Sequence, residues 1–353
     1  MRVVLIAHAN EGVKQPFAGG LESMCWHLVQ GLRERGIDVE LYAGQGSDPD
    51  LRAHELPIHP FVLSADARAD VAMPPERVVS EHFAYLDLML SLEARSDVDI
   101  VHNNCLHYLP LAMASLLPSP MVTTLHTPPT PWLEPAARGL DDARARYVAV
   151  SEETRRAWSP IVAARTIHNG VDTRRWTLGP GGDSLVWFGR IVPEKAPHRA
   201  IAIARAAGLR LTIAGPVWDR GYFDEAIAPQ LGDGVEYAGH LTTAELNEVV
   251  GRSAACLVTS AWEEPFGLVA AEAMATGTPA VVFDRGGLPE VVARGGGAVV
   301  PEGDEAAAVD ALRAVRRLDR RRVRDLCVRR FSLSRMVDDY VALFLEVCER
   351  GAA

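Results

Sequence analysis

Short apolar runs alternate with amphipathic helical patterns along most of the chain, and this alternation occurs twice. In the first half, the runs at 2–8, 38–44, 99–104 and 121–126 are separated by helical spacing of apolar residues. The same pattern resumes after a glycine-rich stretch at 173–184. Strands that are buried on both faces by helices produce this pattern, because nothing along them faces water. The sequence therefore predicts an α/β chain with two parallel sheets.

The glycine-rich stretch marks the expected boundary between two domains. Residues 173–184, TRRWTLGPGGDS, contain one proline and three glycines, a composition typical of a linker. We therefore expect one domain at 1–172 and a second at 184–331. Six apolar runs are expected to be the strands of the second domain: 184–191, 209–215, 235–239, 255–260, 279–283 and 297–300.

Composition and charge exclude several classes of protein. The chain has 353 residues, 48% of them hydrophobic, and a formal net charge of −10. It is therefore a folded protein whose charge argues against a nucleic-acid partner. No apolar run approaches the ~18 residues of a transmembrane segment, and the first residues lack a signal-peptide pattern. The five cysteines are widely spaced and form no metal-binding or redox pair. We expect a cytoplasmic protein.

The stretch 259–290 gathers the strongest candidate functional groups. Glu264 precedes a proline, and the apolar spacing predicts a helix that begins at Phe266. The first N–H groups of a helix have no intrahelical acceptor and lie at the positive end of the helix dipole. We therefore expect the N–H groups of Phe266, Gly267 and Leu268 to form an anion site, which Gly267 lets a ligand approach closely.

Glu272 lies inside the same predicted helix, among alanines and a methionine. A carboxylate in such small, apolar company either has a partner or accepts hydrogen bonds from the hydroxyls of a ligand. The alternative is that Glu272 is a solvated helix residue and that Glu264 only interacts with the helix dipole. Local chemistry alone leaves both interpretations open.

The two glutamates belong to the motif EPFGLVAAE, which AMATGTPAV follows. This motif resembles the signature of retaining glycosyltransferase family 4, also described as glycosyl transferases group 1. The resemblance implies the GT-B fold, in which two Rossmann-like parallel-sheet domains face each other across a cleft. The segment FSLSRMVDDY resembles the crossover segment of the family. Residues 332–353 are therefore expected to form a C-terminal helix that crosses back and packs on the first domain.

Two loops of the first half also resemble donor-binding segments of the family. Gly19 and Gly20 open the first predicted helix, where a phosphate or sugar could come close to the backbone. An ordinary flexible loop is the alternative. His126 ends a predicted strand before a proline-rich loop, and its position resembles that of the family histidine that contacts the donor sugar. A single histidine without this context is more often structural.

The loop FGRIVPEK in the second half carries two cations, Arg190 and Lys195. An arginine fork and a lysine point charge on one short loop suit a diphosphate, and the loop resembles the donor-phosphate motif of the family. The alternative is a surface ion pair of Lys195 with Glu194 or Glu264. The sequence has only two lysines, Lys14 and Lys195, which favours a functional role for Lys195.

Three further residues lie at the ends of predicted strands or in the loops after them. Leu241 belongs to a GHL segment that resembles the one whose backbone contacts the nucleobase. Asn104 stands where many members of the family have a second histidine after His102, and the sequence leaves its role open. The role of Lys14 also stays open.

The resemblance implies a retaining hexosyltransferase that moves a sugar from a nucleoside diphosphate sugar, with UDP favoured, to an acceptor hydroxyl. It implies no metal and no cofactor besides this co-substrate. The acceptor is a small molecule, a glycan or a lipid-linked molecule, and we expect it near 45–75 and 127–140. The candidate catalytic residues are Glu264, His126, Arg190 and Lys195. The candidate donor-binding residues are Gly19, Gly20, Arg190, Lys195, Leu241, Glu264, Phe266, Gly267, Leu268 and Glu272.

Two alternatives to this function remain open at the level of sequence. One is a sugar-nucleotide epimerase or a phosphorylase on the same fold, against which the glutamate pair in its family context argues. The other is an inactive module that binds nucleotide sugars. An inactive relative would be expected to have lost Arg190, Lys195, Glu264 or Glu272, and all four are present.

Overall fold

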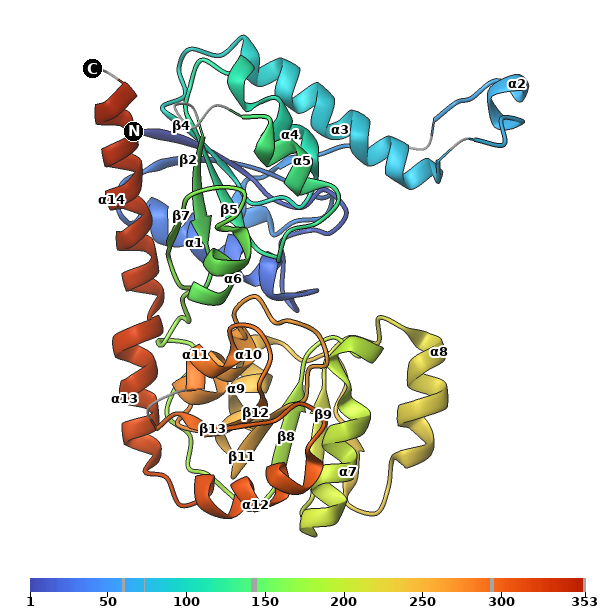
Figure 1. The fold of residues 1–353 in the computed structure, drawn as a ribbon, viewed down its shortest axis with the longest axis vertical. Helices are drawn as coiled ribbons and strands as arrows, with labels where there is room; N and C mark the ends of the chain where they lie inside the picture. The colour runs from blue at the N-terminus through green and yellow to red at the C-terminus, as the bar shows by residue number, and fades with distance from the viewer. Residues whose placement is uncertain (59–60, 73, 141–144, 293–294, 352–353) are drawn as a thin grey trace.

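Two parallel sheets, each covered by helices, form the two halves of the molecule (Figure 1). The computed structural model describes residues 1–58, 61–72, 74–140, 145–292 and 295–351. Every strand pairing within the two sheets is parallel. The α/β class with two parallel sheets, which the alternating apolar runs predicted, is therefore confirmed.

The first sheet has seven strands in the order β3-β2-β1-β4-β5-β6-β7. Its strands are β1 (Arg2–Ile6), β2 (Asp38–Ala43), β3 (His54–Glu55), β4 (Ile100–Asn103), β5 (Met121–Leu125), β6 (Ala145–Ala149) and β7 (Ala164–Thr166). The helices between them are α1 (Gly20–Glu34), α2 (Ala65–Arg68), α3 (Glu76–Glu93), α4 (Tyr108–Ala112), α5 (Leu133–Arg138) and α6 (Glu152–Trp158).

The second sheet has six strands in the order β10-β9-β8-β11-β12-β13. Its strands are β8 (Leu185–Phe188), β9 (Leu211–Ala214), β10 (Val235–Tyr237), β11 (Ala255–Val258), β12 (Ala280–Phe283) and β13 (Gly297–Val300). Its helices are α7 (Pro197–Ala207), α8 (Arg220–Tyr222), α9 (Thr243–Gly251), α10 (Leu268–Ala275), α11 (Leu288–Val292), α12 (Glu305–Val315) and α13 (Arg320–Phe331).

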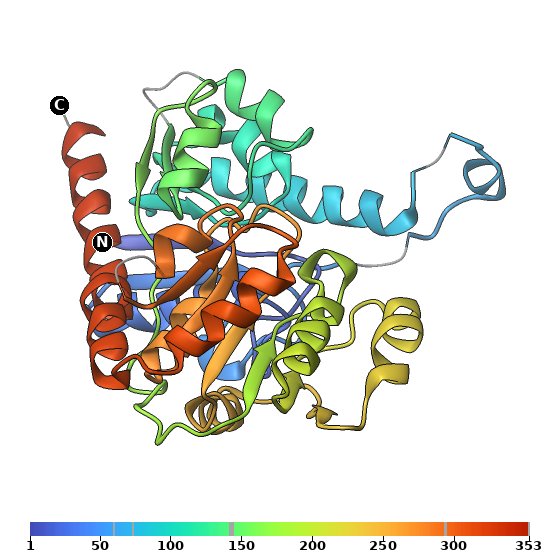
Figure 2. The ribbon, with the colours of Figure 1, turned by 60° about the horizontal axis from the view of Figure 1, so that its bottom comes forward.

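The last helix, α14 (Leu333–Gly351), returns to the first half and runs along it (Figures 1 and 2). Its apolar side chains, among them Tyr340 and Phe344, join the same core as those of α1. The two helices approach closely at Gly31, where a β-carbon would lie 2.6 Å from a methyl group of Val337. The predicted crossover of the C-terminal helix is therefore confirmed.

Helix α10 begins at Leu268, two residues later than the sequence analysis predicted. Gly267 precedes it with φ of +94°, a left-handed conformation that glycine adopts readily. This turn directs the ring of Phe266 into the core of the second half, where it packs 5.4 Å from the ring of Phe331. The prediction that Phe266 starts the helix was wrong, because the spacing of apolar residues does not distinguish a buried residue in a turn from one in a helix.

The segment 45–75 is less irregular than expected. It contains the short strand β3 and the single-turn helix α2, which projects from the body beyond the start of α3 (Figures 1 and 2). Residues 59–60 and 73 of this predicted acceptor region lie outside the described residues.

No helix among the described residues is long and apolar enough to cross a membrane.

Candidate functional site

A cavity of about 340 Å³ lies between the two halves and is lined by both of them. Its lining comes largely from loops at the carboxyl ends of strands, where open parallel sheets bind ligands. All of the predicted site residues line it: Gly19, Gly20, His126, Arg190, Lys195, Leu241, Glu264, Phe266, Gly267, Leu268 and Glu272. Residues that are far apart in the sequence are thus brought together, while their roles in the site stay a proposal.

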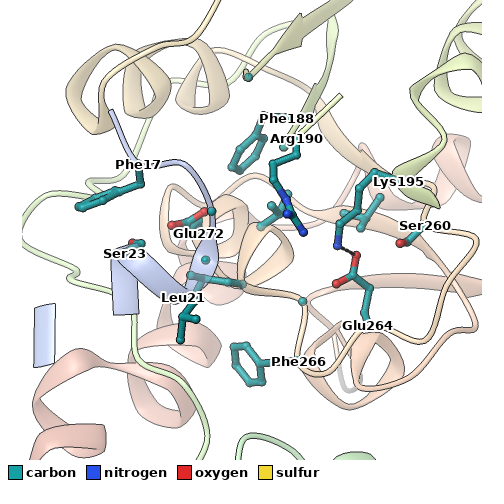
Figure 3. Close-up of a pocket in the computed structure, with 18 of the residues that line it drawn as sticks. Phe17, Leu21, Ser23, Phe188, Arg190, Lys195, Ser260, Glu264, Phe266 and Glu272 are labelled. Carbon is teal, nitrogen blue, oxygen red and sulfur yellow. Dashed lines mark hydrogen bonds and ion pairs between the residues drawn. The ribbon is translucent and has the colours of Figure 1, made fainter. Parts of the chain in front are cut away.

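Lys195 and Glu264, which both line the cavity, form an ion pair (Figure 3). Both side chains are largely buried, and the ammonium of Lys195 also lies 5.2 Å from the ring centroid of Trp262. The N–H of Gly287 donates to the carbonyl of Glu264 at 2.6 Å, which fixes the backbone that carries the carboxylate. Of the two ion pairs that the sequence left open for Lys195, the structure shows the one with Glu264.

Arg190 supplies a cation that pairs with no carboxylate in the described part of the chain. Its guanidinium lies 5.5 Å from the ring centroid of Trp218 and faces the cavity (Figure 3). Gly19, from the first half, comes close to it, since a β-carbon at Gly19 would lie 3.9 Å from Nε of Arg190. Arg190 is therefore available to bind an anion in the cavity, close to the glycine that precedes α1.

The start of α10 provides further hydrogen-bond donors. Within the described residues, the N–H groups of Gly267, Leu268 and Val269 have no hydrogen-bond acceptor, whereas the N–H of Ala270 already donates to the carbonyl of Gly267 at 3.0 Å. The three residues with unsatisfied N–H groups line the cavity. The N–H of Phe266 likewise has no acceptor among the described residues, so the anion site predicted at 266–268 stays a proposal, to which Val269 adds a fourth donor.

Glu272 lies one turn further along α10 and points into the same cavity (Figure 3). Burial raises the pKa of its carboxyl to about 8, because the charged form loses hydration and gains no partner. Among the described residues, no donor hydrogen-bonds to it. Glu272 is therefore mostly neutral at pH 7 in the empty cavity, and it is free to bind hydroxyl groups of a ligand.

The first half contributes a neutral histidine to the cavity. Burial lowers the pKa of His126 to about 3, so that the ring carries no charge at neutral pH. Its Nε2 lies 3.1 Å from Oδ1 of Asn104, a fully buried side chain. The amide oxygen can only accept a hydrogen bond, so Nε2 carries the proton and Nδ1 remains to accept one from a ligand. Asn104, whose role the sequence left open, thus orients His126.

Several residues around the cavity were not identified from the sequence. Phe17 precedes the glycine pair in the same loop, and Trp262 lies two residues before Glu264. The hydroxyls of Ser151 and Thr154, at the start of α6, donate to the carbonyl of Pro265 at 2.5 and 3.1 Å. They therefore join the first half to the loop that carries Glu264. No pattern of residue spacing predicts the contact of Ser151 and Thr154 with Pro265. Phe17 and Trp262 could have been predicted to line the cavity, because each lies two residues from a predicted site residue.

Lys14, the other lysine, lies outside the site. Its side chain is exposed, and it does not line the cavity. The two lysines of the chain thus differ in environment, which makes Lys14 a useful control for experiments on Lys195.

Two family models match adjacent parts of the chain. The model described as Glycosyltransferase Family 4 matches residues 18–175, and the model described as Glycosyl transferases group 1 matches residues 175–324. Together they span residues 18–324, which contain every strand of the two sheets except β1 and all of the predicted site residues that line the cavity.

Curated relatives cover most of the chain. A glycogen synthase of Mycobacterium tuberculosis is 28% identical over 89% of this chain and 86% of its own length. A D-inositol 3-phosphate glycosyltransferase of Mycolicibacterium smegmatis is 29% identical over 90% of this chain and 84% of its own length. The names of the two relatives refer to different molecules, glycogen and D-inositol 3-phosphate.

Solved structures share the fold over the full length. AviGT4, a glycosyltransferase involved in avilamycin A biosynthesis, superimposes with a TM-score of 0.72 at 24% identity, covering 99% of this chain and 98% of its own. Anabaena HepE in complex with UDP-glucose superimposes with a TM-score of 0.75 at 14% identity, covering 98% of this chain and 100% of its own. The predicted GT-B architecture is therefore confirmed.

Proposed function

We propose a reaction for this chain, which belongs to glycosyltransferase family 4: it transfers a sugar from a nucleoside diphosphate sugar to a hydroxyl of an acceptor. The observation that carries this proposal is the convergence of Arg190, Lys195 and the free N–H groups of 267–269 on one cavity. A diphosphate offers the charge and the oxygen atoms that these donors require. The volume of about 340 Å³ lies within the range of small-molecule sites.

We assign the donor mainly to the second half and the acceptor to the first. The proposed units are 1–172, 184–331 and a crossover helix at 332–353. Glu272 accepts hydrogen bonds from the ribose hydroxyls, and the backbone around Leu241 contacts the base. The inward turn of the Phe266 ring limits that residue to backbone contacts with the phosphates.

Three groups act on the transferred sugar and its leaving group. Negative charge builds up on the departing diphosphate, and the fixed donors Arg190 and Lys195 stabilise it. Glu264 holds Lys195 in place through the ion pair and can accept a hydrogen bond from a sugar hydroxyl with its other oxygen. His126, held neutral by burial, contacts the sugar from the first half.

We propose that the configuration of the sugar is retained by attack from the face that the leaving group occupies. Glu264 and Glu272 are the carboxylates among the described residues that line the cavity. The first is paired with Lys195 and the second lies beside the proposed ribose position. Neither is placed to act as the nucleophile of a double displacement. The leaving phosphate therefore takes the proton of the acceptor hydroxyl.

UDP is the proposed nucleotide and no metal is proposed to take part. The solved HepE structure contains UDP-glucose, which supports UDP by analogy of fold. Within the described residues, no group of three or more His, Cys, Asp or Glu side chains is placed to hold a metal ion. The cations of the cavity can instead neutralise the diphosphate.

The anomer released from the donor tests this mechanism. Water can replace the acceptor, so UDP-, GDP-, ADP- and dTDP-glucose are each incubated with the enzyme in EDTA. Proton NMR spectra are recorded before the released glucose mutarotates. We expect one donor to be hydrolysed to α-glucose, the configuration of the donor itself, at a rate that added magnesium leaves unchanged. Initial release of β-glucose, or hydrolysis only with magnesium, would contradict retention or metal independence.

A further inference from the structure

Four rings of the first half form a contiguous cluster from the core to the surface, in which the centroids of His107 and Trp132 are also only 6.4 Å apart. The centroids of Tyr85 and His107 are 5.0 Å apart, those of His107 and Tyr108 are 4.8 Å apart, and those of Tyr108 and Trp132 are 5.6 Å apart. The planes of each pair lie within 29° of parallel. Tyr85 is fully buried, while Trp132 is 58% exposed. We call these four residues the ring stack.

The inner rings of the stack are fixed by hydrogen bonds. The hydroxyl of Tyr85 accepts from the N–H of Ala9 at 2.9 Å and donates to the carbonyl of Ala7 at 3.1 Å. The hydroxyl of Tyr108 lies 3.2 Å from Nδ1 of His82. The rings on which Trp132 packs are therefore preorganised, so their positions do not have to be fixed when a ligand binds.

None of the four rings lines the cavity, but two of them belong to loops that do. His107 is the N-cap of α4, the helix that follows β4, and Trp132 is the N-cap of α5, the helix that follows β5 (Figure 1). Leu106, the neighbour of His107, lines the cavity, as do His126 and Thr127 in the loop that leads to Trp132. The loops that carry His107 and Trp132 thus also form part of the first-half wall of the cavity.

Two ionisable groups in and next to the ring stack, His107 and Arg138, do not present a free charge. Burial lowers the pKa of His107, so its ring is neutral at neutral pH. The charge of Glu81 raises this pKa, whereas His82 and His8 lower it further. Arg138, on the helix that follows Trp132, is paired with Glu134 at 2.8 Å. A neutral aromatic face suits the flat apolar side of a ligand better than it suits a phosphate.

Packing of α3 against α4 explains the inner part of the stack, but Trp132 at the start of α5 remains 58% exposed. Exposing so much of a large aromatic ring forgoes hydrophobic stabilisation that burial would provide. Single exposed apolar residues are common, yet this one ends an ordered stack carried in part by loops that line a cavity. The combination indicates a binding surface.

We propose that the ring stack is the acceptor platform, on which Trp132 stacks against a flat, uncharged apolar face of the acceptor. Two kinds of molecule offer such a face: an aromatic ring and the C–H face of a sugar ring. This inference rests on the proposed transferase function, because it places the acceptor hydroxyl beside the donor sugar near His126.

Two probes separate these kinds of acceptor. 4-Methylumbelliferone has a planar aromatic system without a sugar, and methyl β-D-glucopyranoside has a sugar face without an aromatic ring. Each is titrated by ligand-observed NMR against the full chain saturated with UDP, and again without UDP. We expect at least one probe to bind, Trp132→Ala to weaken its binding about fivefold to tenfold, and Trp132→Phe to stay within about twofold of wild type. Preference for one probe identifies the kind of acceptor face.

A control variant, Leu345→Ala, and the binding of UDP show whether an effect of Trp132→Ala is specific to the acceptor probes. Leu345→Ala removes a side chain that is 52% exposed on α14, and it should leave probe binding unchanged. The affinity for UDP should be the same in wild type and Trp132→Ala. Failure of UDP to bind wild type counts against the donor site alone. The platform is disproved if neither probe binds the wild type, or if both bind Trp132→Ala as tightly as wild type.

Discussion

Replacing Lys195 with alanine is expected to lower kcat by about 10²–10³-fold, the effect of removing one fixed donor from a charge-stabilising site. The ammonium is proposed to stabilise the departing diphosphate, and among the described residues its one ion-pair partner is Glu264. Without it, the buried carboxylate of Glu264 would add repulsion to the developing negative charge. Transfer or donor hydrolysis measured at saturating donor gives kcat directly.

Lys14→Ala is the matched control, because it removes the other lysine from an exposed position outside the cavity. It should leave kcat within about twofold of wild type, in keeping with surface substitutions. Thermal unfolding of both variants shows whether the loss of the ion pair has unfolded the protein. A folded Lys195→Ala variant with near-normal kcat would remove Lys195 from the mechanism.

The second large effect concerns Glu272 and pH. Its raised pKa, about 8, means that the empty protein binds a proton there at pH 6. Ribose hydroxyls donate to the ionised carboxylate, so donor binding at low pH must first release that proton. The ionised fraction of a carboxyl with this pKa rises from about 1% at pH 6 to about 76% at pH 8.5, so we expect the affinity for UDP-glucose, measured by calorimetry, to rise roughly 75-fold over this range. UDP-glucose suits this test because its diphosphate does not titrate in that range.

Glu272→Gln should abolish this pH dependence and weaken binding about tenfold at pH 8.5, since a charge-assisted hydrogen bond is lost. The stability of the ligand-free protein changes in the opposite sense. A carboxyl whose pKa is raised on folding stabilises the fold below its unfolded pKa, and this contribution is lost as pH rises through about 8. The melting temperature of wild type should therefore fall relative to Glu272→Gln over this range. The exposed Glu248→Gln on α9 is the control.

The sequence was sufficient to predict the two sheets and a set of candidate residues that all line one cavity. Buried parallel strands are apolar along their whole length, so runs such as 2–8 and 279–283 identify strands without any knowledge of their neighbours. Functional loops follow the carboxyl ends of such strands, which is why Arg190, Lys195 and His126 could be selected before their positions were known.

Features that depend on tertiary contacts were not predicted. The left-handed turn at Gly267 places the start of α10 at Leu268 and buries Phe266. The turn depends on packing of Phe266 in the hydrophobic core of the second half. The hydrogen bond between Asn104 and His126 joins the ends of two neighbouring strands. The ring stack brings Tyr85 and Trp132 together from separate elements, and the spacing of these residues in the sequence gives no sign of it.

The central claim is that the cavity between the two sheets binds a nucleoside diphosphate. Calorimetric titration of UDP, GDP, ADP and dTDP into the wild-type protein, first in EDTA and then with magnesium, tests it most directly. The account predicts that one of them, with UDP favoured, binds one molecule per chain with an affinity that magnesium leaves unchanged. If none of the four binds under either condition, the cavity is not a nucleotide-sugar site and the proposed function is wrong.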